Sequence, residues 1–352
     1  MSEPSSSGWA LRLQSAWLSR GALAWSLRPL SWLFGAVTSL RRALYRVGAL
    51  QTHSVRAPVV VVGNLIAGGA GKTPVVMALV DALRRHGYTP GIVSRGYGRE
   101  GDGLVDVQRG MAASECGDEP LLMHLRTHAP LVVGRDRVAA ARSLLQRHPS
   151  VDVVVSDDGL QHLRLARDAQ VLVFDERGVG NGWLLPAGPL REALPRVTPQ
   201  RSVVVYNASA ASTPLPGLLA QRRLGGVLEL DAWWRGEPAS LATLAALRGR
   251  PIIAAAGLAR PERFFAMLRD QGLQIRTLAL PDHHGYVSLP WPADTPEVIV
   301  TEKDAIKLDP ARIGSTRVWV APLDFALDAA FDAAVLPLLS PPGPSPHGNA
   351  PA

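Results

Sequence analysis

Short, continuous apolar runs alternate along the chain with segments in which apolar residues recur every three or four positions. Continuous runs are typical of strands buried in a parallel sheet, and the three-to-four spacing is typical of amphipathic helices. The pattern predicts strands at 59–62, 90–94, 131–133 and from Val151 toward Gly159, and helices at 74–86, 119–128 and 135–148. This alternation is that of an α/β protein with a parallel sheet.

A second round of alternation begins near residue 225, with strands predicted at 251–256, 274–280 and 298–301 and a helix at 261–271. A chain of 352 residues is long enough for two domains. The sequence therefore predicts an N-terminal segment at 1–55, a core at 56–224 and a second, smaller α/β domain at 225–337. The tail at 338–352 is rich in Pro, Gly and Ser, which predicts disorder.

The N-terminal segment differs in composition from the rest, since no Asp or Glu occurs from Pro4 to Val80. Across 9–47, arginines are interleaved with apolar and aromatic residues, among them Leu11, Trp9, Trp17, Trp25 and Trp32. The longest uncharged stretch here, Pro29–Leu40, has twelve residues, whereas a spanning helix needs about 20 apolar ones. No compact apolar core ends in a small-residue cleavage site, so a cleavable signal is not indicated.

Arginines interleaved with tryptophans favour an amphipathic segment that lies in the headgroup plane of an anionic membrane. Pro29 is expected to divide this segment into two helices. The alternative is a helix that packs on the domain surface with its arginines in solvent.

The strand predicted at 59–62 leads into a glycine-rich loop, and Lys72 and Thr73 then open the helix. In this context the loop N–H groups and the helix N-terminus can bind phosphate, Lys72 can reach the β/γ-phosphates, and the Thr73 hydroxyl can bind Mg²⁺. The residues expected to bind the nucleotide are Ile66, Ala67, Gly68, Gly69, Ala70, Gly71, Lys72 and Thr73. The spacing departs from G-x-x-x-x-G-K-[ST], whose first glycine falls on Ile66. We therefore predict a variant P-loop that binds a nucleoside triphosphate, with an ordinary strand-to-helix turn as the alternative.

Two acidic pairs are further candidates for chemistry. The strand after Val151 ends in Asp157 and Asp158, as in a Walker B arrangement, where a carboxylate at the carboxyl edge of the sheet binds Mg²⁺. A simple turn is the alternative. Asp118 and Glu119 precede a predicted helix and are either capping residues or a carboxylate pair at the nucleotide. Spacing does not decide between these roles, nor does it assign one to His283.

Charge and cysteine content narrow the classes of function. The formal net charge is +7, but only three of the 37 basic residues are lysines, namely Lys72, Lys303 and Lys307. An arginine excess can follow from genome bias alone, so we predict no nucleic-acid binding, and no obligate protein partner is evident. The single cysteine, Cys116, excludes an intramolecular disulfide and fits a reducing compartment.

Seven segments, taken in order, resemble those of one enzyme family. They are GNLIAGGAGKTP (63–74), SRGYGR (94–99), GDEP (117–120), DDGLQHLRLARD (157–168), LLPAGPLRE (184–192), PDHHGY (281–286) and TEKDAIKL (301–308). From about residue 10 to 335 the chain resembles the tetraacyldisaccharide 4'-kinases, the lipid A 4'-kinases of Gram-negative bacteria. The departure at Ile66 agrees with that family's own shortened glycine pattern.

The resemblance implies that the γ-phosphate of ATP is transferred to the 4'-hydroxyl of a tetraacylated glucosamine disaccharide 1-phosphate, giving lipid IV-A in lipid A biosynthesis. It implies a P-loop NTPase-like fold with ATP and Mg²⁺ as cofactors. It also implies a peripheral protein on the cytoplasmic face of the bacterial inner membrane, whose partners are the acylated glycolipid and an anionic membrane surface.

Carried over by position, the resemblance also implies roles for single residues. Asp118 would accept the proton of the sugar hydroxyl, and His283 would orient or tune Asp118. Lys72 and Thr73 would hold the phosphates and Mg²⁺. The other implied residues are Glu119, Asp157 and Asp158 for Mg²⁺, in no set order, Arg95 and Arg191 for phosphates, and Gln161 and His162 near the active edge.

Two rival interpretations stay open on sequence alone. Deviant P-loop ATPases, which act as nucleotide switches or assembly factors at a membrane, carry K-G-G-x-G-K-[ST], but Ala67 stands where their extra lysine would be. The second rival is a non-enzymatic module of the membrane surface that uses nucleotide only as a switch. Consumption of ATP that depends on a lipid acceptor separates a kinase from both.

Overall fold

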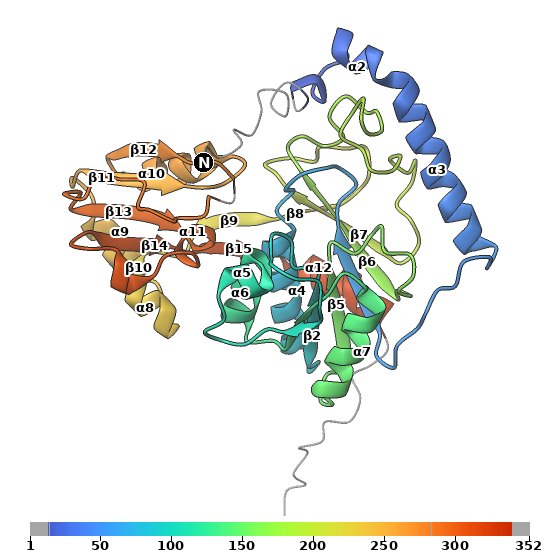
Figure 1. Cartoon of the computed structure of the whole chain (residues 1–352), viewed down its shortest axis with the longest axis horizontal. Coiled ribbons are helices and arrows are strands. Elements are labelled where there is room, and N and C mark those ends of the chain that lie inside the picture. Colours follow the sequence, from blue (N-terminus) through green and yellow to red (C-terminus); the bar gives the residue numbers. More distant parts are fainter. Residues whose placement is uncertain (1–12, 14, 283, 340–352) are drawn as a thin grey trace, which may run out of the picture. The chain divides into compact units, whose positions relative to one another are not determined.

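A computed structural model of the chain describes residues 13, 15–282 and 284–339. The chain forms two compact units, each assembled from segments that are distant in sequence (Figure 1). Unit 1 comprises Met1–Arg95, Asp136–Ala220 and Leu327–Ala352, and unit 2 comprises Gly96–Arg135 and Gln221–Ala326. The expected α/β class with a large parallel sheet is confirmed.

Unit 1 is built on a parallel sheet in the strand order β2-β5-β1-β6-β7-β8. The strands are β1 (Val59–Gly63), β2 (Pro90–Ser94), β5 (Val153–Asp157), β6 (Ala169–Asp175), β7 (Ser202–Asn207) and β8 (Leu218–Leu219). Val60 of β1 lies opposite Val155 on one side and Ala169 on the other. Because β1 lies inside the sheet and is buried along its whole length, its residues form a continuous apolar run.

Three helices of unit 1 follow the sheet strands or close the chain: α4 (Lys72–Arg85), α7 (Arg137–Arg147) and α12 (Ala329–Val335), which leads into the 3-10 turn η2 (Leu336–Leu338). The helices predicted at 74–86 and 135–148 are thereby confirmed, with ends shifted by up to two residues. α7 begins after Asp136, whose carboxylate accepts hydrogen bonds from the N–H groups of Val138 and Ala139 at 2.9 and 3.3 Å.

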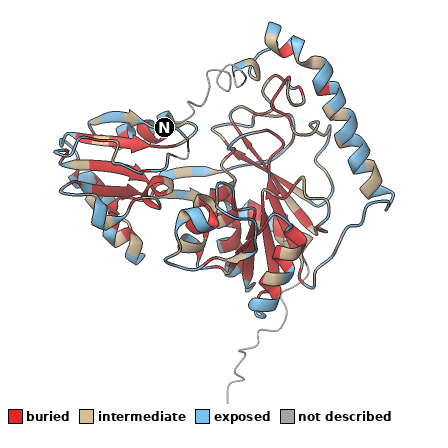
Figure 2. Cartoon of the chain, viewed as in Figure 1, coloured by how far each residue is buried: buried red, intermediate tan, exposed pale blue. Residues whose placement is uncertain are grey.

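Within the described residues of the N-terminal segment, α2 (Ala22–Ser26) and α3 (Arg28–Arg46) are separate helices, and residues 13, 15 and 16 are helical as well, so the segment is divided as expected but not into two helices alone. The break lies at Leu27, and Pro29 sits in the first turn of α3, where its missing N–H is tolerated. Ser31 is the one buried residue of α3, so this helix is largely exposed (Figure 2). Residues 1–12 and 14, including Trp9 and Leu11 of the predicted amphipathic segment, lie outside the described part of the chain. Among the residues that are described, no helix is long and apolar enough to cross a membrane.

Unit 2 has a sheet of its own in the order β10-β14-β13-β11-β12, with β10 antiparallel to β14 and the other pairs parallel. Its strands are β10 (Leu228–Glu229), β11 (Ile252–Ala256), β12 (Ile275–Ala279), β13 (Glu297–Thr301) and β14 (Arg317–Ala321). Its helices include α8 (Leu230–Arg235), α9 (Leu241–Ala246), α10 (Pro261–Asp270) and α11 (Glu302–Ala305). Phe265, Leu268 and Ile299 are fully buried in the core between α10 and the sheet.

The remaining part of unit 2 comes from residues 96–135, which the expected division assigned to the core at 56–224. They form α5 (Ala113–Cys116), α6 (Asp118–Thr127) and the antiparallel pair β3 (Val105–Asp106) and β4 (Leu131–Val133), and a second pair joins β9 (Gln221–Leu224) to β15 (Leu323–Ala326). The grouping differs from the expected one because α6 packs on α11, a contact between segments far apart in sequence. The predicted disordered tail lies outside the described residues from position 340, while Leu338 belongs to η2.

Candidate active site

The predicted P-loop of unit 1 joins β1 to α4 and is held by side chains from other loops. Gly68 and Gly71 have φ of +88° and +73°, in the left-handed region that favours glycine. The Asn64 amide donates to the Gly68 carbonyl at 3.2 Å, and Arg177 Nη2 donates to the Gly69 carbonyl at 2.7 Å. Asn207 Nδ2 donates to the Ala70 carbonyl at 3.1 Å. Carbonyl oxygens of the loop are thus tied back to the protein, an arrangement that suits an anion-binding loop.

The segment LLPAGPLRE supports the same loop from a second side. The N–H of Ala67 donates to the Pro189 carbonyl and the N–H of Arg191 to the Leu65 carbonyl, both at 2.7 Å, and Ile66 bridges to Leu190. This motif therefore acts on the phosphate loop through its backbone, which its sequence alone did not indicate.

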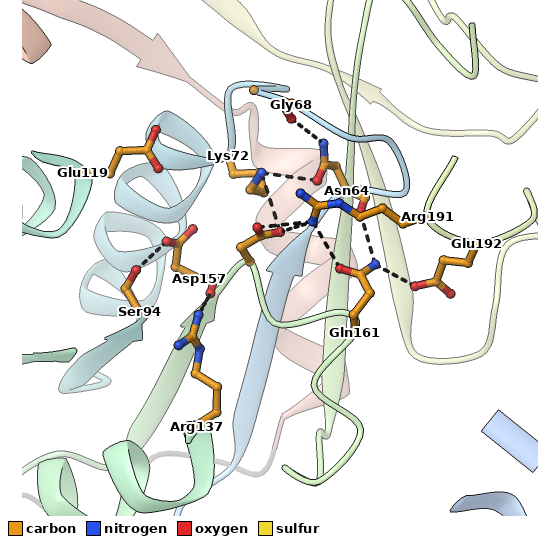
Figure 3. Close-up of polar contacts among 12 residues, drawn as sticks. Asn64, Gly68, Lys72, Ser94, Glu119, Arg137, Asp157, Gln161, Arg191 and Glu192 are labelled. Atoms are coloured by element: carbon orange, nitrogen blue, oxygen red, sulfur yellow. Dashed lines mark hydrogen bonds and ion pairs between the residues drawn. The ribbon is translucent and has the colours of Figure 1, made fainter. Parts of the chain in front are cut away.

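Lys72 points back along the loop, as a P-loop lysine should. Its Nζ donates to Asn64 Oδ1 at 3.2 Å and lies 3.6 Å from Asp158 Oδ1 (Figure 3). Thr73 follows in the first turn of α4 and is 2% exposed. The structure thus brings both predicted residues to the carboxyl edge of the sheet, where ligands of open α/β sheets bind.

Asp158 presents its carboxylate to two cations. Besides Lys72, Arg191 Nη1 lies 3.1 Å from Asp158 Oδ1. Burial alone would raise the pKa of Asp158, but Lys72, Arg191 and Arg137 outweigh burial and lower it, so the carboxylate is ionised.

Asp157 lies in a different environment from its neighbour. It is buried, and its Oδ2 accepts a hydrogen bond from Ser94 Oγ at 2.8 Å, while Arg137 Nη2 donates to its backbone carbonyl at 3.2 Å (Figure 3). Burial lowers the pKa of Arg137 to about 10, which leaves it charged at neutral pH. Asp158 lies in the turn that follows β5, and both acidic residues belong to a network of charged and polar side chains.

Mg²⁺ fits this donor set. No group of three or more His, Cys, Asp or Glu side chains that could hold a metal ion occurs within the described ranges. Mg²⁺ at nucleotide sites commonly uses one or two carboxylates together with substrate phosphates and water, and the Thr73 hydroxyl adds a further oxygen. The predicted ligand Glu119 belongs to unit 2.

A chain of polar contacts connects this site to α3. Arg191 Nη1 lies 3.3 Å from Gln161 Oε1, Gln161 Nε2 donates to Glu192 Oε1 at 2.7 Å, and Glu192 Oε2 pairs with Arg42 at 2.7 Å. Burial, followed by Arg137 and Arg95, lowers the pKa of the nearby His162 to about 4, so this imidazole is neutral. Arg95 and Arg191, implied for phosphates, and Gln161 and His162, implied near the active edge, thus belong to one neighbourhood in unit 1.

The helix α3 exposes an apolar stripe. Leu30, Leu33, Val37 and Leu40, at helical spacing, are all more than half exposed. The opposite side of the helix contacts the body of unit 1, where Ser31 Oγ donates to the Leu184 carbonyl at 2.8 Å. A cavity of about 600 Å³ lies between the two, lined among others by Arg28, Trp32, Leu184 and Leu194. The helix α3 thus packs on unit 1 with one side and exposes an apolar stripe on the other.

Unit 2 holds the second predicted carboxylate pair. Gly117 is the N-cap of α6 and has φ of +97°, so Asp118 and Glu119 are the first two helical residues rather than caps. Asp118 Oδ2 lies 2.9 Å from Lys307 Nζ, and Glu119 pairs with Lys303. Burial alone would lower the pKa of Lys303, but the charges of Glu119, Asp282 and Asp118 raise it. His283 lies outside the described residues, so its predicted relation to Asp118 stays a prediction.

Sequence reasoning missed several supporting groups. Asn64, Arg177 and Asn207 hold the P-loop, but a single Asn or Arg in a loop carries no signal of such a role. Lys307 was also missed, although it stood in a recognised motif, and the scarcity of lysine in this chain was the available clue.

The chain is similar to proteins of one family. The family profile described as Tetraacyldisaccharide-1-P 4'-kinase matches residues 23–340. A tetraacyldisaccharide 4'-kinase from Methylibium petroleiphilum is 56% identical over 341 residues, which cover 96% of this chain and 95% of that protein. The one from Leptothrix cholodnii is 54% identical, covering 94% and 96%. The crystal structure of the "apo" form of LpxK from Aquifex aeolicus in complex with ATP aligns with a TM-score of 0.74 at 28% identity, covering 90% of this chain and 100% of that one.

Proposed function

Because the chain belongs to the tetraacyldisaccharide 4'-kinase family, we propose that it transfers the γ-phosphate of ATP to the 4'-hydroxyl of a tetraacylated glucosamine disaccharide 1-phosphate. The chain is an ATP-binding kinase of lipid A biosynthesis, and the product of this transfer is lipid IV-A. The observation that carries the proposal is the P-loop, whose Lys72 meets Asp158, the residue after β5, at the edge of the sheet. The alternatives of a nucleotide switch, an assembly ATPase and a non-enzymatic module find no support in this family.

Unit 1 binds the nucleotide through Ile66–Thr73, and Thr73 with Asp157 or Asp158 supplies protein oxygens to Mg²⁺. When bound, this ion neutralises charge on the β- and γ-phosphates. Asp118 accepts the proton of the attacking sugar hydroxyl, and His283 orients or tunes Asp118. Phosphoryl transfer needs little covalent help beyond alignment, charge neutralisation and one such base.

A direct assay tests the proposal. The protein is incubated with radiolabelled ATP, Mg²⁺ and the disaccharide 1-phosphate acceptor, and lipids are separated by thin-layer chromatography. A labelled phospholipid that forms only with both ATP and acceptor is the expected result. Hydrolysis of ATP that is indifferent to the acceptor would instead support a switch or an assembly ATPase.

We further propose that the protein is peripheral, on the cytoplasmic face of the bacterial inner membrane, with an anionic surface as its partner. The acceptor carries four acyl chains, so it stays in the bilayer and the enzyme must work at its surface. The apolar stripe of α3 and the arginines beside it suit such a surface, each arginine being worth about 1 kcal/mol there. Figure 2 shows how little of this helix is covered by the protein itself.

The membrane proposal predicts that a chain beginning near residue 50 binds anionic vesicles much less well than the full chain. Its activity should fall more on acceptor embedded in bilayers than on acceptor dispersed in detergent. Salt should weaken the electrostatic part of binding and spare the apolar part. Vesicle co-sedimentation measures this, and equal binding by both chains would contradict a membrane role.

A milder change tests the apolar stripe of α3 separately from the rest of the N-terminal segment. The double variant Leu33→Gln and Val37→Gln should weaken vesicle binding about tenfold or more, because two half-exposed apolar side chains lose their burial in lipid. Val197→Gln is the matched control, since Val197 is an exposed valine of the same unit that lies off the stripe. Both proteins should keep their activity toward detergent-dispersed acceptor.

A further inference from the structure

Two lysines of unit 2 face the carboxylates at the start of α6. Lys307 Nζ lies 2.9 Å from Asp118 Oδ2, and Lys303 pairs with Glu119. The Lys307 side chain is only 7% exposed, and that of Asp118 is 20% exposed. An ion pair so shielded from water holds its two partners in place more firmly than an exposed pair does.

The other end of α6 is fixed by the same segment of chain. Arg126, in the last turn of α6, donates through Nη1 to both carboxylate oxygens of Glu302 at 2.7 and 2.6 Å. Glu302 is 5% exposed and also accepts a hydrogen bond from Trp233 Nε1 at 3.1 Å. Residues 302–307 therefore form ion pairs with both the first and the last turn of α6.

Lysine is rare in this chain, which sets positions 303 and 307 apart from its other basic residues. Only three of its 37 basic residues are lysines, and each of the three pairs with an acidic residue predicted to act as the base or to bind Mg²⁺: Lys72 with Asp158, Lys303 with Glu119 and Lys307 with Asp118. In a chain so rich in arginine, these positions keep the compact ammonium, which a planar guanidinium replaces only with altered geometry.

Electrostatics supply a reason for the pairing. Asp118 and Glu119 are adjacent carboxylates, so they repel each other, although the helix N-terminus favours negative charge. Without its lysine, Asp118 would be drawn toward other donors or toward solvent, and its oxygen would lose its fixed direction. A base that is displaced by about 1 Å loses about 100-fold in rate.

We infer that Lys307 is a positioning residue of the phosphoryl transfer, which holds the Asp118 carboxylate toward the acceptor hydroxyl. Lys303 keeps Glu119 away from that hydroxyl. Lys307 itself touches neither ATP nor the sugar in this role. The inference rests on the proposed function of Asp118 as the base.

The test is a comparison of steady-state kinetics in full-length variants. Lys307→Met, which keeps length and loses charge, should lower kcat about 100-fold and change the KM for ATP and for acceptor by less than about threefold. Lys307→Arg should recover about tenfold of that loss, because charge returns with imperfect geometry. In an Asp118→Asn background, Lys307→Met should add little further loss.

Arg250→Met is the matched control. Arg250 pairs with Glu297 in the same unit at the same 2.9 Å, outside the candidate site. This variant should keep the kcat of the wild-type protein.

Several results would overturn the inference. One is a kcat of Lys307→Met within about threefold of wild type, and another is an effect of this variant on KM in place of kcat. The others are no recovery of kcat in Lys307→Arg and full additivity of Lys307→Met with Asp118→Asn. Should Lys307→Met fail to fold, Lys307→Gln takes its place, and unfolding of both would assign Lys307 to the fold and not to the base. A wild-type protein that does not phosphorylate the acceptor would overturn the proposed function instead.

Discussion

Lys72→Ala is expected to lower turnover about 1,000-fold or more while the protein stays folded. The ammonium of Lys72 reaches Asn64 and Asp158 across the mouth of the P-loop, so it is placed to stabilise charge that develops on the transferred phosphoryl group. Arg191 continues to pair with Asp158 when the lysine is removed, so the local charge balance survives in part. A large loss of rate with a small loss of stability is therefore the expected signature.

The measurement combines lipid phosphorylation with thermal denaturation of the same samples. Arg85→Ala is the matched control, because it removes a cation from the other end of α4, where Arg85 pairs with Asp332 at 3.1 Å. The control should keep its turnover. Near wild-type activity in a folded Lys72→Ala protein would rule out the assignment of Lys72 to the nucleotide.

The parts of the fold that sequence predicted share a physical origin. β1, β2 and β4 were placed within one residue of their observed ends, because a strand buried on both faces leaves an unbroken apolar run. The P-loop followed from its position between strand and helix. β6 and β7 carry similar runs, but loops rather than helices precede them, so the expected strand–helix alternation did not point to them.

Sequence patterns did not show which segments, distant along the chain, pack together. Nothing local in residues 96–135 shows that α6 packs on α11, since that contact depends on ion pairs formed across more than 170 positions. An amphipathic pattern likewise defines a stripe on α3 without saying whether protein or solvent covers it. The spacing of Leu30 and Leu40 would be the same in a helix whose apolar side is buried.

The candidate site was predictable where a motif requires particular residue types at fixed positions next to a strand or a helix. Lys72, Thr73, Asp157 and Asp158 lie at the ends of predicted elements, so the sheet topology brings them together. Asp118 could be assigned a role only by resemblance, because an acidic residue at a helix start is as typical of a cap as of a base. In the structure the N-cap of α6 is Gly117, and Asp118 pairs with Lys307.

Asp118→Ala is expected to reduce kcat by about 100- to 10,000-fold and to weaken ATP binding far less, since a general base acts mainly in the transition state. The alanine variant also leaves the nearly buried Lys307 without its carboxylate, so part of its effect could come from disturbed packing. Asp118→Asn is the sharper change, because the amide oxygen still accepts from Lys307 but is not basic. A folded Asp118→Asn protein with normal kcat would remove Asp118 from the role of base.

His283→Ala should act in the same direction, with a smaller loss of kcat. If His283 orients or tunes Asp118, its contribution disappears once the carboxylate is gone, so the double variant should lose less than the product of the two single losses. Kinetics of the four proteins in one acceptor assay, with ATP affinity measured separately, completes the cycle. Fully independent losses would mean that the two residues act on different steps, and Asp118 would then depend on Lys307 and its own helix for its orientation.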